Sequence, residues 1–474
     1  MSVRLGARDL VDLVLDAGTA VSWDRPVDLS GVAPDYRAEL EAAAARAGTD
    51  ESVITGRGLV RGRPVAFVVN EFRFLAGSIG RAAAARIVAA VRRATAEGLP
   101  LLAATASGGT RMQEGTPAFV QMVEISRALM DHRAAGLPYL AYLRHPTTGG
   151  VFASWGSLAH ITVAEPGALV GFLGPKVYEA LHGSPFPAGV QVAENLAAHG
   201  VIDAVVPADD LPELVDRALG VLVDPPVRPT LPRRLGAATD RDAWACITST
   251  RAEERVGVRD LLRHGASGTV RLSGTDEGER DATVLVALTR LDGQPCVVVG
   301  QDRSRQTPES PMGPSALRQA RRGMELAEEL RLPLVTVIDT PGAELSQAAE
   351  EGALAGEIAR CIATLTTLTV PTVSVLLGQG CGGGALALLP ARTVIAAERA
   401  WLAPLPPEGA SVIVHGHVAH AADMARRQGV RAVDLHADGA VHVVVPEGDD
   451  DSPAALAVAV AAACGTALAA APVR

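Results

Sequence analysis

The feature that most constrains the fold is an internal repeat: one pattern of strands and glycine turns occurs twice, roughly 230 residues apart. Four features recur in the same order: Val68–Asn70 as Val298–Gly300, Ser107–Gly109 as Asp339–Gly342, Gly149–Gly150 as Gly383–Gly384, and Ala164–Glu165 as Ala397–Glu398. One such match arises by chance, whereas four in register indicate a duplication. A chain of 474 residues is also too long for one ordinary domain. We therefore expect two domains of the same fold.

Each half alternates short apolar runs with amphipathic helical stretches, such as residues 80–96 and 318–330. This alternation predicts an α/β fold in which ββα or βαβ units build a largely parallel sheet. A segment rich in proline and arginine between the halves is typical of a linker. The predicted order is an N-terminal domain, a linker and a C-terminal domain, at residues 1–223, 224–240 and 241–474.

Composition restricts the class of protein. Hydrophobic residues make up 48% and charged residues 20% of the chain, as in a globular protein with large cores. A net charge of −10 argues against general nucleic-acid binding. No uninterrupted apolar run reaches the ~18 residues of a membrane span, and the charged N-terminus lacks a signal-peptide core. A cytoplasmic location without membrane association is therefore expected, with an Ala-rich helix at 453–471 packed on its own domain.

Cysteine and histidine usage gives no metal or nucleophile signature. The five cysteines are scattered and none forms a C-x-x-C pair, so neither a disulfide framework nor a zinc ribbon is indicated. Cys381 is interpreted as a small buried residue, because no histidine lies near it in the sequence. His415, His417 and His420 have no Cys or carboxylate at metal-ligand spacing, which favours a surface or helix-start role.

Glycine placement carries the chemical signal. A Gly-Gly pair between a strand and a helix lets backbone N–H groups point at one spot with no Cβ in the way. Such donors stabilise developing negative charge, as in an oxyanion hole. One such turn is not specific, because tight turns and close helix packing also use glycine. Four of them, two in each repeat, suggest two facing anion sites; they lie at 107–114, 146–154, 339–343 and 378–388.

The motifs around these turns resemble a known family. Segments of the first half resemble the β subunit of acetyl-CoA carboxylase carboxyltransferase, at 72–80, 107–115, 146–156, 164–177 and 200–206. Segments of the second half resemble the α subunit, at 306–330, 332–343, 349–359, 370–388 and 407–411. The matches keep the order and spacing of both subunits, so the chain resembles the two subunits fused into one polypeptide.

The resemblance implies a crotonase-like fold, a ββα superhelix, in each domain. It implies that a carboxyl group moves from carboxybiotin on a carrier protein to an acyl-CoA, giving malonyl-CoA or a homologue, as in fatty acid biosynthesis. The chain has no G-x-x-x-x-G-K-[ST] motif for ATP, and its one lysine, Lys176, is not in a biotinylation motif. A separate biotin carboxyl carrier protein and a biotin carboxylase are therefore expected as partners.

The resemblance also implies roles for individual residues. Gly149 and Gly150 would stabilise the acyl-CoA enolate, and Gly383 and Gly384 the ureido oxygen of biotin. The other residues of the acyl-CoA side would be Ser107, Gly108, Gly109, Arg111, Gly174 and Lys176. Those of the biotin side would be Asp339, Gly342 and Ala343. Two alternatives stay open: a salt bridge at the edge of the core for Arg111, and an ordinary exposed lysine for Lys176.

The chain departs from the family pattern in several places, one of which is Asp302–Arg305 in place of a Lys-rich loop. No cysteine precedes Cys246, so the four-cysteine zinc domain of the β subunit is missing and no zinc is expected. Glu344–Ser346 replaces the usual Tyr-Pro-Gly loop on the biotin side. A biotin-independent decarboxylase of malonyl thioesters and a scaffolding subunit are the competing interpretations. In the family, a β-type domain faces an α-type domain of another protomer, so a homodimer or a higher homo-oligomer is expected.

Overall fold

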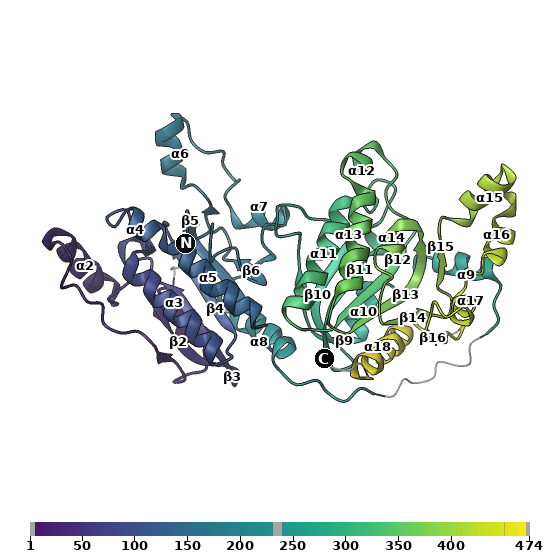
Figure 1. The fold of residues 1–474 in the computed structure, drawn as a ribbon, viewed down its shortest axis with the longest axis horizontal. Helices are drawn as coiled ribbons and strands as arrows, with labels where there is room; N and C mark the ends of the chain where they lie inside the picture. Colours follow the sequence, from purple (N-terminus) through teal and green to yellow (C-terminus); the bar gives the residue numbers. More distant parts are fainter. Residues whose placement is uncertain (1–4, 231–238, 450, 471–474) are drawn as a thin grey trace. The chain divides into compact units, whose positions relative to one another are not determined.

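The computed structural model describes residues 5–230, 239–449 and 451–470. The chain forms two compact units, Met1–Leu219 and Gly220–Arg474, and each contains one mixed sheet covered by helices (Figure 1). The predicted α/β fold with two similar domains is confirmed. Part of the predicted linker packs on the second unit, because Arg290 donates to the carbonyls of Asp224 and Pro225. Residues 231–238 of that linker lie outside the described residues.

Unit 1 has strands in the order β1-β2-β3-β4-β5-β6-β8, with β7 beside β5. The first three strands are antiparallel and the rest are parallel. The strands are β1 (Val21–Ser22), β2 (Val53–Val60), β3 (Arg63–Asn70), β4 (Leu101–Ser107), β5 (Tyr139–Thr148), β6 (Ile161–Ala164), β7 (Val170–Gly171) and β8 (Ala204–Val205). The helices are α1 (Ala7–Val14), α2 (Pro34–Ala47), α3 (Arg81–Ala96), α4 (Thr116–Phe119), α5 (Gln121–Ala134), α6 (Pro175–His182), α7 (Ala193–Ala198) and α8 (Leu211–Leu222).

Unit 2 repeats this topology, with the order β16-β14-β13-β12-β11-β10-β9 and β15 beside β13. Its strands are β9 (Ala266–Leu272), β10 (Val284–Leu291), β11 (Gln294–Gln301), β12 (Leu334–Thr340), β13 (Thr372–Cys381), β14 (Thr393–Ala397), β15 (Trp401–Ala403) and β16 (Val443–Val445). Its helices are α9 (Ala243–Thr250), α10 (Val258–His264), α11 (Pro314–Glu329), α12 (Gln347–Glu351), α13 (Leu354–Thr367), α14 (Gly382–Leu386), α15 (Pro407–His415), α16 (Ala421–Arg427), α17 (Ala432–Ala437) and α18 (Pro453–Ala470).

The two central sheets keep the same register. Equivalent cross-strand pairs are Ala103–Ala141 and Ser107–Thr147 in β4–β5, and Thr336–Ser374 and Thr340–Gly380 in β12–β13. This register also aligns Asn70 with Gln301, so the predicted match of Asn70 to Gly300 is wrong by one residue. A one-residue slip reverses the face on which every side chain lies. The preserved register therefore brings the glycine turns of both units to the same end of their sheets.

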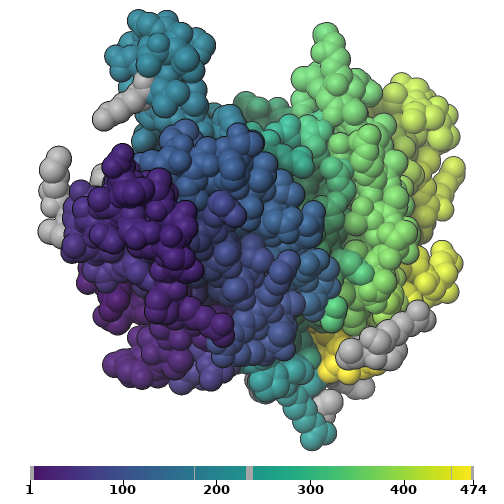
Figure 2. All heavy atoms as spheres, turned by 60° about the vertical axis from the view of Figure 1, so that its left-hand side comes forward, coloured from purple at the N-terminus to yellow at the C-terminus, as the bar shows by residue number. Residues whose placement is uncertain are grey.

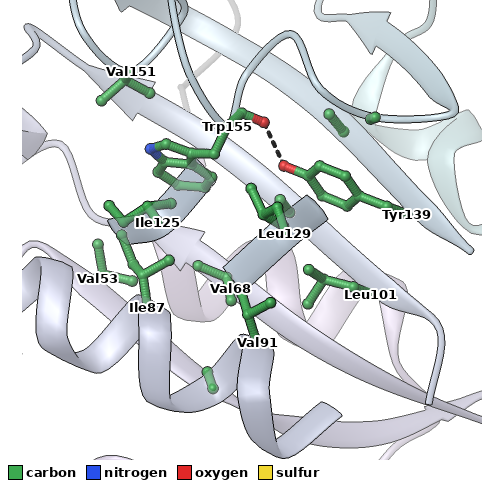
Figure 3. Close-up of a cluster of buried hydrophobic side chains, with 14 of the residues drawn as sticks. Val53, Val68, Ile87, Val91, Leu101, Ile125, Leu129, Tyr139, Val151 and Trp155 are labelled. Carbon is green, nitrogen blue, oxygen red and sulfur yellow. Dashed lines mark hydrogen bonds between the residues drawn. The ribbon is translucent and has the colours of Figure 1, made fainter. Parts of the chain in front are cut away.

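Small and branched aliphatic side chains fill the cores, since aromatic residues make up only 3% of the chain. In unit 1, α3 and α5 pack Ile87 and Ile125 toward the sheet residue Val68 (Figure 3). Burying each such side chain stabilises the fold by about 1.5–3 kcal/mol. The two largest buried members of this cluster are Tyr139, at the start of β5, and Trp155, five residues after the second glycine turn.

Two further helices have distinctive surroundings. The predicted Ala-rich helix is α18, which is long and apolar enough to cross a membrane, although 56% of it is buried in the fold as in a core helix. In unit 1, the segment that carries α6 stands off the body of the unit as a knob (Figures 1 and 2).

Candidate active site: two pairs of glycine turns

The first glycine turn of unit 1 follows β4 and is held by two side chains. Ser107 Oγ accepts the N–H of Gly109 at 3.0 Å, and Asn70 Oδ1 accepts the N–H of Ala106 at 3.3 Å. Gly109 has φ 107°, a conformation that side chains disfavour. Hydrogen bonds to the side chains of Ser107 and Asn70 therefore fix the turn, and the positive φ at position 109 favours glycine.

The second glycine turn of unit 1 follows β5. Gly149 has φ 63°, and its N–H donates to the Phe172 carbonyl at 2.9 Å. The chain then enters a short helical turn, in which the hydroxyl of Ser154 donates to the Gly150 carbonyl. The Gly149 N–H is thus already hydrogen-bonded within the protein.

The hydrophobic core anchors this second turn. Val151 and Trp155 are almost completely buried, and the hydroxyl of Tyr139 donates a hydrogen bond to the Trp155 carbonyl (Figure 3). Because Trp155 follows the Gly-Gly pair by only five residues, its burial fixes the position of the turn relative to the sheet.

The two turns of unit 1 lie against each other. A Cβ built on Gly109 would lie 3.5 Å from Gly149 Cα and 3.6 Å from Gly150 N. Within the described part of the chain, the N–H groups of Thr110, Gly150 and Val151 have no hydrogen-bond acceptor. Unpaired N–H groups on two adjoining turns form a set of donors for an oxygen that becomes negatively charged.

The first turn of unit 2 repeats the construction. Thr340 Oγ1 accepts the N–H of Gly342 at 3.1 Å, as Ser107 does for its own turn. Gln301 Oε1 accepts the N–H of Asp339 at 3.1 Å, at the position that Asn70 takes in unit 1. Similar hydrogen bonds at equivalent positions mean that the duplication preserved the turn as well as the strands.

The second turn of unit 2 leads from β13 into α14. Gly382 has φ 63°, and the first amides of a helix have no acceptor within it. A Cβ built on Gly384 would lie 3.4 Å from the backbone nitrogen of Ala343, so this turn also lies against the first one. The N–H groups of Ala343, Gly383 and Gly384 have no acceptor among the described residues.

The register shows which glycines correspond between the units. Gly149 aligns with Gly382, and both have φ 63°; Gly150 aligns with Gly383. The predicted recurrence of Gly149–Gly150 as Gly383–Gly384 is therefore wrong by one residue, because three consecutive glycines made the alignment ambiguous. All four predicted catalytic glycines nevertheless lie at these turns, and their roles stay a proposal.

Arg111 has the salt-bridge role that the sequence left open. Its guanidinium is almost fully buried and forms an ion pair with Glu51, with further hydrogen bonds to Ser52 Oγ and the Ser78 carbonyl. It also lies over the Phe74 ring, 5.3 Å from the centroid. The expectation that Arg111 contributes to the CoA side can hold only through the loop that it supports, because the guanidinium is committed to these partners.

The remaining predicted residues of the acyl-CoA side lie apart from one another in unit 1. Gly108, in the first glycine turn, donates its N–H to the carbonyl of Ala76 at 2.9 Å. Gly174 is the residue before α6, and Lys176 is in the first turn of that helix. Gly174 and Lys176 therefore belong to the knob, and their contact with CoA stays a proposal.

Asp339 is the most perturbed acid near the turns. Burial raises the pKa of its carboxyl to about 6, and the Arg303 guanidinium, 3.1 Å away, together with a hydrogen bond from the Gln379 N–H, opposes that rise. The carboxylate fits because residue 378 is glycine: a Cβ there would lie 2.5 Å from Asp339 Oδ1. The buried Asp339 carboxylate, at the start of the first turn of unit 2, thus packs against β13, the strand that leads into the second turn.

We expect Asp339→Asn to stabilise the protein increasingly as the pH rises from about 4 to about 6. The folded carboxyl has the higher pKa, so the stability from its protonation is complete below the unfolded pKa of 3.8 and is lost as pH rises through about 6. Asparagine keeps the uncharged form at every pH, so the difference should reach about 3 kcal/mol at neutral pH. Urea unfolding of both proteins from pH 4 to 7.5 measures it. A difference that does not vary with pH would refute this assignment.

Other sequence interpretations can be compared with the structure. Cys381 is buried, and burial raises the pKa of its thiol to about 11, as expected for a packing residue. The rings of His415 and His420 lie 4.5 Å apart on unit 2, but no group of three or more His, Cys, Asp or Glu among the described residues could hold a metal ion. In the altered loop, Ser346 donates to Glu344 Oε1 at 2.6 Å, and Leu345 between them is 96% exposed.

The sequence alone missed several residues at the turns. The backbone N–H groups of Thr110 and Val151 join the donor set, and Gly382, which aligns with Gly149 and has φ 63°, was not among the predicted residues. Thr110 could have been found, because the repeat aligns it with Ala343, which was predicted. Gln301 gave no signal beyond being a polar residue at the end of an apolar strand.

Comparison with known proteins defines the family. The model of the carboxyl transferase domain matches residues 30–452, most of the chain. The chain belongs to the carboxyl transferase family. A Mycobacterium tuberculosis relative, a probable biotin-dependent acyl-coenzyme A carboxylase beta3 subunit, is 60% identical over 447 residues, which are 94% of this chain and 90% of the relative.

Two further similar proteins cover nearly the whole chain. The acetyl-coenzyme A carboxylase carboxyl transferase subunits beta/alpha of Saccharopolyspora erythraea are 36% identical over 479 residues, covering 97% of this chain and 84% of theirs. A solved structure of transcarboxylase 12S superposes with a TM-score of 0.80 at 21% identity, covering 99% of this chain and 91% of that chain. The predicted crotonase-like fold is confirmed by this similarity.

Proposed function

We propose that this carboxyl transferase family member moves a carboxyl group from carboxybiotin, presented by a separate carrier protein, to a short acyl-CoA. The observation that carries the proposal is the pair of N–H clusters, one at the glycine turns of each unit. A reaction that places negative charge on two different oxygen atoms needs two such clusters. The M. tuberculosis relative is named as a biotin-dependent acyl-coenzyme A carboxylase subunit, which agrees with this chemistry.

In the proposed reaction, unit 1 stabilises the acyl-CoA. Loss of a proton from the carbon next to the thioester carbonyl leaves an enolate, whose oxygen would accept hydrogen bonds from Thr110, Gly150 and Val151. The enolate carbon would then form a bond to the carboxyl carbon while the bond between that carbon and the biotin nitrogen breaks, and this nitrogen would take up the proton lost from the acyl-CoA. Since these donors are held before the reaction begins, little reorganisation is needed as charge develops.

Unit 2 would hold the biotin side. The ureido oxygen of biotin gains negative charge when the carboxyl group leaves, and the N–H groups of Ala343, Gly383 and Gly384 can donate to it. The packing of Gly384 against Ala343 leaves no room for a side chain between the two turns, which suits a flat cyclic urea. Biotin supplies the carboxyl group and the leaving nitrogen.

We further propose that a second copy of this chain covers these turns. Exposed apolar side chains border them in both units: Met112 three residues after Gly109, and Leu345 three residues after Gly342. Leu386, within α14, is also exposed. Apolar groups in equivalent places of a duplicated chain favour a symmetric pairing of copies, as in a homodimer or a multiple of it. The transcarboxylase 12S structure is itself described as a hexamer assembly.

The test supplies the carboxylated carrier, or free carboxybiotin, with acetyl-, propionyl- or butyryl-CoA and measures the carboxylated product. We expect product with at least one of these acyl-CoAs, acetyl-CoA giving malonyl-CoA. Absence of product from all three, with a folded protein, would overturn the proposal. Release of CO₂ from malonyl-CoA without biotin would instead favour the decarboxylase alternative.

A further inference from the structure

We propose that Gln301 is a positioning residue for the biotin-side donor cluster, an inference that rests on the proposed function. Gln301 ends β11 and is completely buried. Its Nε2 donates to the Gly384 carbonyl at 2.7 Å, and its Oε1 accepts the N–H of Asp339 at 3.1 Å. One side chain therefore joins the first glycine turn of unit 2 to the second.

The Gly384 carbonyl depends on this contact. Because α14 is only five residues long, the following amides bond elsewhere: Ala387 N–H to the Gly383 carbonyl, and Leu388 N–H to the Ala385 carbonyl. Gln301 is the hydrogen-bond donor to the Gly384 carbonyl among the described residues. A buried carbonyl left without a donor costs about 1–3 kcal/mol, so without Gln301 the turn would rotate toward another partner.

Three consecutive glycines make external support necessary. Glycine has the largest backbone freedom of any residue, and residues 382–384 contain no side chain that could fix the turn by packing. A donor cluster accelerates a reaction only when its N–H groups are aimed in advance. Gln301 supplies that restraint, and its Nε2 also lies 3.5 Å from Met312 Sδ, which limits its own rotation.

In unit 1 the second glycine turn is held by a different hydrogen bond. The residue aligned with Gly384 is Val151, whose carbonyl accepts the backbone N–H of Gly156 at 2.9 Å. Asn70, the counterpart of Gln301, is one methylene shorter and donates to the carbonyls of Ser52 and Gly77 instead. The bridge between the two turns is therefore specific to the biotin-side unit.

A matched control is present in the same unit. Gln319 on α11 is also buried, donates from Nε2 to the Val284 carbonyl at 2.7 Å and accepts the Asp281 N–H at Oε1 at 3.1 Å. Gln301→Leu and Gln319→Leu thus remove the same two kinds of hydrogen bond from a buried glutamine, and only the first touches the glycine turns.

The experiment compares both variants with the wild-type protein. We expect Gln301→Leu to lower kcat for transfer from the carboxylated carrier by on the order of ten- to a hundredfold, with KM for acyl-CoA unchanged. Both variants should lower Tm by similar amounts, and Gln319→Leu should keep kcat within about twofold of the wild-type value. Equal kcat values for the two variants would overturn the inference. If Gln301→Leu fails to fold, Gln301→Asn, which keeps a polar group but shortens the reach, is measured by the same criteria.

Amide hydrogen exchange separates this inference from the proposed function. Peptides that cover residues 382–388 should exchange faster in Gln301→Leu than in Gln319→Leu, whatever reaction the protein catalyses. Faster exchange with no transfer by the wild-type protein would refute the function and keep the positioning role. Unchanged exchange with an active wild-type protein would refute the positioning role alone.

Discussion

Gly149→Val is expected to lower the rate of carboxyl transfer by on the order of 10²–10³-fold, the usual cost of losing one donor of an oxyanion hole. Gly149 has φ 63°, which a β-branched residue strongly disfavours. A Cβ there would also lie 3.4 Å from Gly109 Cα, in the neighbouring turn. The backbone must therefore rotate, and this rotation carries the adjoining Gly150 N–H away from the acyl-CoA. Steady-state kcat with acyl-CoA and carboxybiotin measures the effect.

Gly98→Val is the matched control for this prediction. Gly98 has φ 65° and a Cβ there would meet nothing within 4 Å, so the variant carries similar backbone strain without touching a glycine turn. It should lose about 1–2 kcal/mol of stability and keep its kcat. If Gly149→Val keeps wild-type kcat while remaining folded, the acyl-CoA enolate is not held at this turn.

Arg111→Leu is expected to lower the free energy of unfolding by about 3–5 kcal/mol, because it leaves a buried carboxylate without its partner. The side chains of Arg111 and Glu51 are 1% and 2% exposed, so solvent cannot screen the charge that remains. Chemical denaturation measures the loss. In the protein that stays folded, the affinity for acyl-CoA should change little, since the guanidinium is almost fully buried and paired with Glu51.

The double variant Arg111→Leu, Glu51→Leu provides the control. Removing both charges removes the unpaired carboxylate, so the double variant should recover much of the stability lost in the single one. A single variant as stable as wild type, or one with normal stability and a large loss of acyl-CoA affinity, would give Arg111 a substrate-binding role instead.

The sequence predicted the fold and the positions of the glycine turns well, because both depend on local patterns. Glycine pairs after apolar strands are visible without a structure, and their recurrence showed which segments are equivalent. What failed was the alignment within Gly382–Gly384, since consecutive glycines are indistinguishable until the strand register and φ angles are known.

Side-chain roles were harder to predict than backbone roles. Arg111 pairs with Glu51, sixty positions away in the sequence, so only the fold brings the two charges together. Gln301 was missed for a similar reason: a polar residue at a strand end is usually solvated, and only the burial of β11 shows that it is enclosed. Long-range partners of this kind carry no periodicity that a single sequence could show.

The use of main-chain donors has a consequence for inhibition. The proposed donors are peptide N–H groups, and the thiol beside them, Cys381, is buried with a pKa of about 11. A reagent that needs a thiolate would therefore react slowly with Cys381, because its raised pKa keeps the thiol protonated at neutral pH. Under the proposed function, an inhibitor that imitates the shape and charge of an anionic oxygen would bind these N–H groups, and resistance to it would arise from changes that move the backbone.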